Sequence, residues 1–159
     1  MSNEFFELEK AEYIKRDKEL DFIASQNLCS EEVLEACSSI AQMKYAEGFP
    51  GKRYYAGCEN IDRGEELAIE RVCKLFGCAF ANVQPHSGAQ ANTAVQMALC
   101  KPGDTIIGMS LNSGGHLTHG AKPTFSGKYF NVIQYDVNPE TYLINYDNIE
   151  QLVHSHKPR

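Results

Sequence analysis

Residues 78–110 read CAFANVQPHSGAQANTAVQMALCKPGDTIIGMS, and this stretch decides the expected fold. The apolar run over 78–84 predicts a buried strand, and the turn PHSGAQ leads into a predicted helix over 91–100. Lys101–Asp104 breaks the chain before a second predicted strand in TIIGMS. A strand, a helix and a strand in this order are typical of an α/β protein with a mostly parallel sheet.

The residues after this stretch extend the same pattern. They predict a third strand over 129–135, a turn at Asn138-Pro139 and a helix over about 146–154. Three strands make a poor parallel sheet, which needs covered faces and more neighbours. We therefore expect residues 45–159 to be the first part of a large domain that continues beyond residue 159.

The residues before the stretch are expected to be mainly helical. Asp62 is the predicted cap of a helix that ends at Gly77, and Ser30 is the predicted N-cap of a helix that runs to about Ile40. Residues 5–20 predict an amphipathic helix that lies on another surface. Residues 1–44 are accordingly interpreted as an N-terminal helical arm.

Composition excludes several classes of protein. The net charge of −6 argues against a nucleic acid or an anionic membrane as the main partner. No apolar run is long enough to span a bilayer, and the charged N-terminus does not resemble a secretory signal. The six cysteines are irregularly spaced without a CxxC motif, so no metal site is expected. They are interpreted as reduced, small core residues of a cytoplasmic protein.

Residues 45–55 read YAEGFPGKRYY, and their apolar residues follow neither a helical nor a strand period. The Gly-Phe-Pro-Gly centre is expected to break any regular element. A loop so rich in aromatic and titratable groups is typical of a binding or catalytic site, although an ordered surface loop is the alternative. Glu47, flanked by aromatic residues, is a candidate for proton transfer. Otherwise it is a solvated glutamate or a partner of Lys52 or Arg53.

Residues 83–92, VQPHSGAQAN, place a tight turn before a helix. Free backbone N–H groups at a helix start can bind an anion, and Ser87 adds a hydroxyl, so a phosphate is the expected guest. The stretch matches neither GxGxxG nor GxxxxGK[ST], which indicates neither a dinucleotide fold nor a P-loop. A plain turn with Ser87 as the helix cap is the alternative.

Residues 111–120, LNSGGHLTHG, combine glycines with His116 and His119. The glycines allow a backbone that presents the imidazole of His116 to an open site. No carboxylate or cysteine nearby completes a metal-ligand set, so a metal is not expected. His116 is instead a candidate for stacking or acid–base chemistry, or a loop histidine hydrogen-bonded to backbone.

Taken together, FIASQN, KYAEGFPGKRYYAGCE, FANVQPHSGAQAN and GMSLNSGGHLTHG resemble the serine hydroxymethyltransferase family from about Leu20 onward. The resemblance implies an aspartate-aminotransferase-like fold (fold type I) that binds pyridoxal 5′-phosphate, in a homodimer with shared active sites. It also implies reversible transfer of the serine hydroxymethyl group to tetrahydrofolate, giving glycine and 5,10-methylenetetrahydrofolate. This reaction belongs to one-carbon metabolism and amino-acid biosynthesis.

The resemblance further implies roles for individual residues. Glu47 matches the glutamate at the substrate hydroxymethyl group, and Ser87 opens the turn that holds the cofactor phosphate. His116 matches the histidine that stacks on the pyridine ring, and the tyrosines near Glu47 match residues that enter the partner subunit's site. The implied catalytic residues are Glu47, Tyr55 and His116; the cofactor-binding residues are Ser87, Gly88, Ala89, His116, Tyr45 and Tyr54; the substrate-binding residues are Ser25, Glu47 and Tyr55; the folate-binding residues are Leu111, Gly115, His116 and Leu117.

The sequence departs from the family pattern at a few positions. Gln26 stands where the family usually has glutamate, Ala56 replaces the first glycine of YYGG, and Ala89 removes a hydroxyl from the phosphate turn. Asn112-Ser113 replaces a common Ala-His pair. The family's Schiff-base lysine, the aspartate at the pyridine nitrogen and the substrate-binding arginine lie beyond Arg159.

The resemblance therefore implies that this piece is inactive without its remainder. One alternative is a non-catalytic fragment that only associates with full-length subunits. Another is a different enzyme of the same cofactor class, such as a threonine aldolase, but the YAEGFPGKRYY stretch argues against it.

Overall fold

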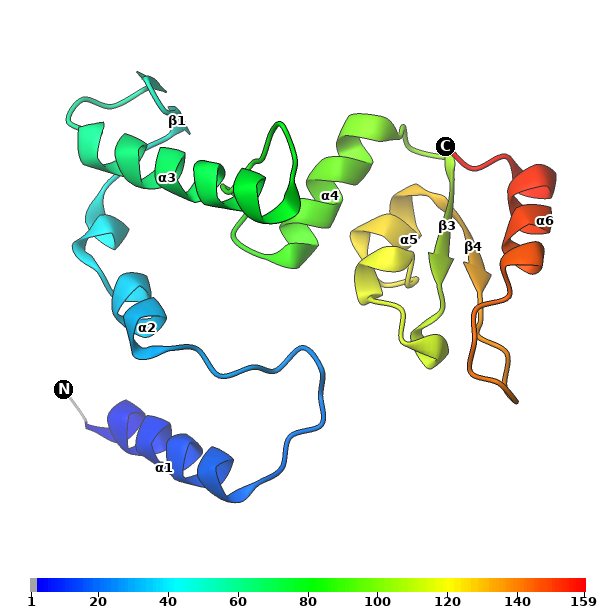
Figure 1. The fold of residues 1–159 in the computed structure, drawn as a ribbon, viewed down its shortest axis with the longest axis horizontal. Coiled ribbons are helices and arrows are strands. Elements are labelled where there is room, and N and C mark those ends of the chain that lie inside the picture. Colours follow the sequence, from blue (N-terminus) through cyan, green and yellow to red (C-terminus); the bar gives the residue numbers. More distant parts are fainter. Residues whose placement is uncertain (1–2) are drawn as a thin grey trace. The chain divides into compact units, whose positions relative to one another are not determined.

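The computed structural model describes residues 3–159, which form two compact units (Figure 1). The first unit extends to Leu67 and the second runs from Ala68 to Arg159, so the boundary falls within helix α3 (Glu59–Phe76). The elements of each unit follow in chain order.

Helix α1 (Glu4–Lys18) confirms the predicted N-terminal helix. The prediction that it is amphipathic is wrong, because its apolar residues are spread around the axis. Phe5 and Phe6, for example, are both exposed rather than turned toward a buried face. An ion pair between Arg16 and Glu12, with Nε and Oε1 2.9 Å apart, lies on its surface.

Helix α2 (Glu31–Cys37) begins where the sequence predicts. The Ser30 hydroxyl accepts a hydrogen bond from the Val33 N–H at 3.4 Å, which confirms Ser30 as the N-cap. The helix ends before Ile40 because the Ser38 hydroxyl donates to the Glu35 carbonyl, a local contact that competes with helix continuation. A 3₁₀ turn, η1 (Ile40–Met43), follows.

A small antiparallel hairpin follows η1. Strands β1 (Gly48–Phe49) and β2 (Lys52–Arg53) pair with Phe49 opposite Lys52. Pro50 and Gly51 form the turn, and the φ of +70° at Gly51 fits the third position of a type II turn, with proline before it. The expectation that this stretch holds no regular element is therefore wrong, because residues that break a long element suit a two-residue turn.

Helix α3 begins at Glu59, so the prediction that Asp62 caps it is wrong. Asp62 instead lies in the first turn, where its carboxylate reaches the hairpin. The predicted end is confirmed: Gly77 has a φ of +63°, and the Cys78 N–H donates to the Cys73 carbonyl at 3.1 Å.

The second unit contains a parallel strand pair, as predicted. Strands β3 (Thr105–Met109) and β4 (Asn131–Tyr135) pair from Thr105 opposite Asn131 to Met109 opposite Tyr135. Helix α4 (Gly88–Leu99) precedes β3 and starts earlier than the sequence predicts, while α6 (Tyr146–His156) follows β4 (Figure 1). The short helix α5 (Phe125–Tyr129), between the two strands, is missed by the sequence pattern.

The predicted strand over 78–84 is wrong. These residues form no strand, and the Phe80 side chain is 91% exposed. A strand requires a partner for its backbone N–H and C=O groups, and no strand between residues 3 and 159 pairs with this segment.

Few hydrophobic side chains are buried in the part of the chain that the structure describes, namely Cys58, Ala121 and Phe130. All the cysteines are free thiols, but Cys29, Cys37 and Cys78 are exposed, so the expectation of core cysteines holds for Cys58 and fails for these three. Within residues 3–159, no helix combines the length and the apolar character needed to cross a membrane.

Candidate functional site

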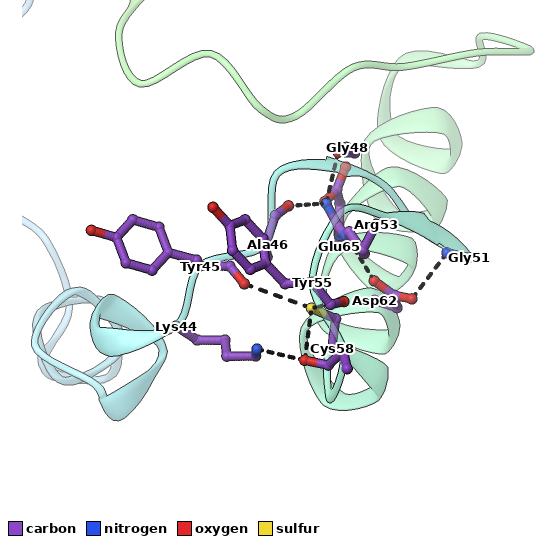
Figure 2. Close-up of polar contacts among 11 residues, drawn as sticks. Lys44, Tyr45, Ala46, Gly48, Gly51, Arg53, Tyr55, Cys58, Asp62 and Glu65 are labelled. Atoms are coloured by element: carbon purple, nitrogen blue, oxygen red, sulfur yellow. Dashed lines mark hydrogen bonds and ion pairs between the residues drawn. The ribbon is translucent and has the colours of Figure 1, made fainter.

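Arg53 is the centre of a polar cluster in the first unit. Its Nε lies 2.7 Å from Asp62 Oδ1 and its Nη2 lies 2.6 Å from Glu65 Oε2, and its side chain is only 5% exposed (Figure 2). These hydrogen bonds raise the pKa of Arg53, and the bond with Asp62 has the largest effect. The pKa of Asp62 is lowered mainly by the hydrogen bond from the Gly51 N–H, at 2.9 Å, and to a smaller extent by the bond from Arg53. The hairpin is thus fixed to α3 by charge.

The same guanidinium holds the backbone on both sides of Glu47. Arg53 Nη1 donates to the carbonyl of Ala46 at 2.7 Å and to the carbonyl of Gly48 at 2.8 Å. The Tyr54 N–H donates to the Glu47 carbonyl at 3.0 Å. Glu47 itself is exposed, so a rigid loop presents its carboxyl group. Glu47 is therefore not the carboxylate that pairs with Arg53.

The loop also presents aromatic side chains. The rings of Tyr45 and Tyr55 stack with centroids 5.7 Å apart and an interplanar angle of 28° (Figure 2). The buried Cys58 thiol donates to the Tyr55 carbonyl at 3.3 Å, and Lys44 Nζ donates to the Ala56 carbonyl at 2.7 Å. The backbone is therefore fixed while the tyrosine rings remain exposed, and Tyr54 is the most exposed of the three.

In the second unit, the start of α4 is an open helix N-terminus. The Ser87 hydroxyl accepts from the Gln90 N–H at 3.1 Å, and the Ala91 N–H donates to the Ser87 carbonyl at 3.0 Å. The N–H groups of Gly88 and Ala89 precede this first intrahelical bond, and a Cβ on Gly88 would meet no atom within 4 Å. This geometry agrees with Ser87 as a cap and leaves room for an anion.

The loop that carries His116 follows the carboxyl end of β3. It contains two 3₁₀ turns, η2 (Leu111–Ser113) and η3 (Leu117–His119). The Gly115 N–H donates to the Ser110 carbonyl at 2.8 Å, and a Cβ on Gly115 would overlap the Met109 carbonyl. A glycine is therefore required for the backbone to pass this closely.

Hydrogen bonds connect His116 to α4 through Thr118. His116 Nδ1 lies 3.1 Å from the Thr118 N–H and 2.7 Å from Thr118 Oγ1. Asn92 Nδ2 donates to Thr118 Oγ1 at 2.8 Å, and Gln96 Nε2 donates to the Thr118 carbonyl at 2.9 Å. The His119 ring meets the His116 ring edge to face. Among residues 3–159, no cluster of at least three His, Cys, Asp or Glu side chains is arranged for a metal.

Asp136, which follows β4, anchors the other end of this loop. Its Oδ1 accepts hydrogen bonds from the hydroxyls of Ser110 and Ser113, the latter at 2.9 Å. These bonds lower the pKa of Asp136, and the bond from Ser110 has the largest effect. Sequence reasoning missed Asp136, although its position directly after a predicted parallel strand was an available signal, because sites gather at the carboxyl ends of such strands.

The predicted site residues fall into two groups, one in each unit. The first unit contains the Glu47 loop and Ser25, which lies between α1 and α2. The second unit contains the α4 start and the His116 loop. Within the second unit, the bond between Asn92 and Thr118 brings the α4 start and the His116 loop together. Exposed Leu111 and Leu117 flank His116 in that loop.

A loop that follows a parallel strand and is bonded to a helix with an open N-terminus is the arrangement in which α/β proteins commonly bind ligands. The family profile described as "Serine hydroxymethyltransferase" matches residues 1–159. The chain therefore belongs to the serine hydroxymethyltransferase family, as its motifs predict.

Relatives of the same name are similar over nearly the whole chain. Serine hydroxymethyltransferase of Rickettsia massiliae is 60% identical over 156 residues, which are 98% of this chain and 37% of that protein. The protein of Rickettsia felis has the same identity and coverage. That of Rickettsia canadensis is 60% identical over 153 residues, which are 96% of this chain and 36% of that protein. The chain thus spans little more than a third of these relatives.

Proposed function

We propose that this chain forms part of an enzyme that reversibly transfers the hydroxymethyl group of serine to tetrahydrofolate. The observation that carries the proposal is the fixed backbone around Glu47, which presents a carboxyl group beside stacked tyrosines. Catalytic groups act efficiently when the surrounding structure holds them in position. Membership of the family supports the same reaction.

The proposed cofactor is pyridoxal 5′-phosphate, held in a fold of type I. The start of α4 fits its phosphate, because the N–H groups of Gly88 and Ala89 are open and the Ser87 hydroxyl keeps its proton as a donor. Ala89 lacks the hydroxyl that the family often has there but keeps its N–H. When bound, the cofactor supplies an electron sink for the substrate carbon.

The remaining roles belong to side chains on both loops. Glu47 would hold or move the proton at the serine hydroxymethyl oxygen, and the Tyr55 hydroxyl would orient the substrate. The face of the His116 ring would stack on the cofactor ring, with Leu111 and Leu117 offering apolar surface to the folate. In the proposed homodimer, the tyrosines of one protomer would reach the site of its partner, and residues 45–159 would form the first part of the large domain after the helical arm.

A second candidate function is association without catalysis. Apolar side chains at the end of α3 and just after it are exposed, namely Leu75, Phe76 and Phe80. Such a patch favours docking against another protein surface. In that case the chain would associate with full-length subunits through these residues and would transfer no carbon.

The first test joins this chain to the remaining part of the Rickettsia massiliae relative and measures folate-dependent cleavage of serine. Glu47→Gln is expected to lower turnover by about a hundredfold or more, since it removes a proton-transfer group. The visible absorbance of the bound cofactor should stay near normal. Glu66→Gln, which alters an exposed glutamate of α3, is the matched control and should leave turnover unchanged.

Equal turnover of Glu47→Gln and the unaltered enzyme would contradict the role of Glu47.

The second candidate function, association without catalysis, is tested with the 159-residue chain itself, whose mass is 17.8 kDa. Binding of this chain to the full-length relative, without any absorbance change when the cofactor is added, would favour association without catalysis.

A further inference from the structure

We propose that Thr118 is a positioning residue that fixes the ring orientation and the tautomer of His116, and that Asn92 orients the Thr118 hydroxyl. The evidence is a chain of hydrogen bonds within the second unit, from α4 through η3 to the imidazole. These hydrogen bonds are sufficient to determine the tautomer of His116. The consequence for catalysis rests on the proposed function.

The direction of each hydrogen bond follows from chemistry. The Thr118 backbone N–H can only donate, so His116 Nδ1, at 3.1 Å, must accept. The Asn92 amide nitrogen also donates, so Thr118 Oγ1 accepts from it at 2.8 Å and directs its own proton toward His116 Nδ1 at 2.7 Å. Both donors therefore converge on the same ring nitrogen.

In a neutral imidazole, a nitrogen that accepts leaves the proton on the other nitrogen. His116 thus carries its proton on Nε2, where it offers one N–H donor of defined direction. Gln96 holds the Thr118 carbonyl at 2.9 Å, which limits movement of the threonine. The ring that would face the cofactor is therefore oriented by α4, the same helix whose first turn forms the proposed phosphate site.

The chain offers variants that separate these roles. Thr118→Val keeps the branched shape and the backbone N–H but removes the hydroxyl. Thr118→Ser keeps the hydroxyl and should restore the bond. Thr105→Val, in β3, removes a hydroxyl from the same unit without touching His116 and serves as the matched control.

The test records the imidazole nitrogen resonances of His116 by ¹⁵N NMR in the full chain. The unaltered chain and Thr118→Ser should show one tautomer, protonated at Nε2, as should the Thr105→Val control. Thr118→Val and Asn92→Ala should weaken this preference, so that a measurable share of Nδ1-protonated His116 appears, because the backbone N–H of residue 118 then remains as the one fixed donor to Nδ1. A proton on Nδ1 in the unaltered chain would overturn the proposal, and this measurement needs no variant to fold. Identical spectra for Thr118→Val and Thr118→Ser would also overturn it.

A second readout uses the joined enzyme. Thr118→Val should lower kcat about tenfold to a hundredfold, the scale of a small misplacement of a catalytic group, with little change in the KM for serine. Thr118→Ser should recover most of kcat. An unaltered kcat together with the expected NMR result would contradict the role of His116 in the proposed reaction while leaving the tautomer assignment intact.

Discussion

The loop around Glu47 is organised by one buried cation, Arg53, whereas the loop around His116 is held by several neutral groups, the Asp136 carboxylate and a close backbone contact. In the first loop, Arg53 joins two carboxylates of α3 to two carbonyls of the hairpin. In the second, Thr118, Ser113 and Gly115 each contribute a separate contact.

The difference teaches where each loop is sensitive to change. A single cation that makes many bonds concentrates the stability of a loop in one residue, so its removal breaks all of them together. Separate neutral contacts spread the stability, so the loss of one hydroxyl is tolerated. A glycine packed against backbone is the exception, since no side chain fits in its place.

The largest effect is expected from Gly115→Ala. The new Cβ would overlap the Met109 carbonyl and approach the Ser110 carbonyl to 2.7 Å, and backbone atoms cannot move aside as a flexible side chain can. We expect a loss of about 3 kcal/mol in the local stability of the His116 loop. Amide hydrogen exchange of Gly115 and of the β3–β4 pair measures this loss.

Gly64→Ala is the control for this change. Its Cβ would meet no atom within 4 Å on α3, so the variant should leave exchange in the His116 loop unchanged. It should stabilise the helix by about 1 kcal/mol, because alanine favours helices over glycine. If Gly115→Ala left the exchange of the loop unchanged as well, backbone packing would not hold the His116 loop.

The next effect is expected from Arg53→Met, which tests the charged half of the comparison. The variant leaves Asp62 and Glu65 facing each other without their shared cation and frees the Ala46 and Gly48 carbonyls. Exchange of the Tyr54 amide should become about tenfold faster or more, the factor that corresponds to one hydrogen bond to a charged group.

Two further variants make this test specific. Lys52→Met removes an equal charge from the exposed neighbour in β2 and should leave the Tyr54 amide unchanged. The Tyr54 exchange rate in Arg53→Lys should lie between those of Arg53→Met and Lys52→Met, because an ammonium group keeps the charge but lacks the planar, forked geometry of the guanidinium. If Arg53→Met and Lys52→Met had the same effect, net charge rather than the Arg53 contacts would hold the hairpin.

The parts of the fold that depend on local signals could be predicted from sequence. The cap at Ser30, the helix end at Gly77 and the β3–β4 pair all follow from short patterns. The segment 78–84 could not be predicted correctly, since an apolar run indicates burial but does not supply a strand partner. Helix α5 has 5 residues, too few for a helical period to be recognised.

The candidate site divides in the same way. Its exposed groups, such as Glu47 and Tyr55, were visible in the composition of one stretch. The residues that hold them were not, because the bond between Arg53 and Asp62 joins a hairpin to a helix across a distance that sequence patterns do not encode. The sequence pattern therefore predicts a helix cap at Asp62 instead of this bond. The role of Thr118 has no sequence signal for the same reason, since its partner Asn92 lies on α4.

The smallest effect is expected when the pH is lowered. Each loop is held in part by one aspartate, so the acid responses of Asp62 and Asp136 can be compared directly. Hydrogen bonds lower the pKa of both Asp62 and Asp136 from the ordinary value of 3.8. A lowered pKa means that the folded state favours the ionised form, so the stabilisation is present above pH 3.8 and is lost as the pH falls through the folded pKa. Both loops should therefore loosen only at strongly acidic pH.

Substitution by asparagine should separate the two. Asp62 uses both oxygens, one for Arg53 and one for the Gly51 N–H, so in Asp62→Asn an amide nitrogen must face a donor. Asp136 accepts both hydroxyls on one oxygen, which the amide oxygen of Asp136→Asn can replace. Near neutral pH, amide exchange in the hairpin should therefore become faster in Asp62→Asn. Amide exchange in the His116 loop should stay unchanged in Asp136→Asn. The acid-induced loosening of the His116 loop should also disappear in Asp136→Asn. An equal loosening of both loops near neutral pH would mean that charge holds the His116 loop as strongly as the hairpin.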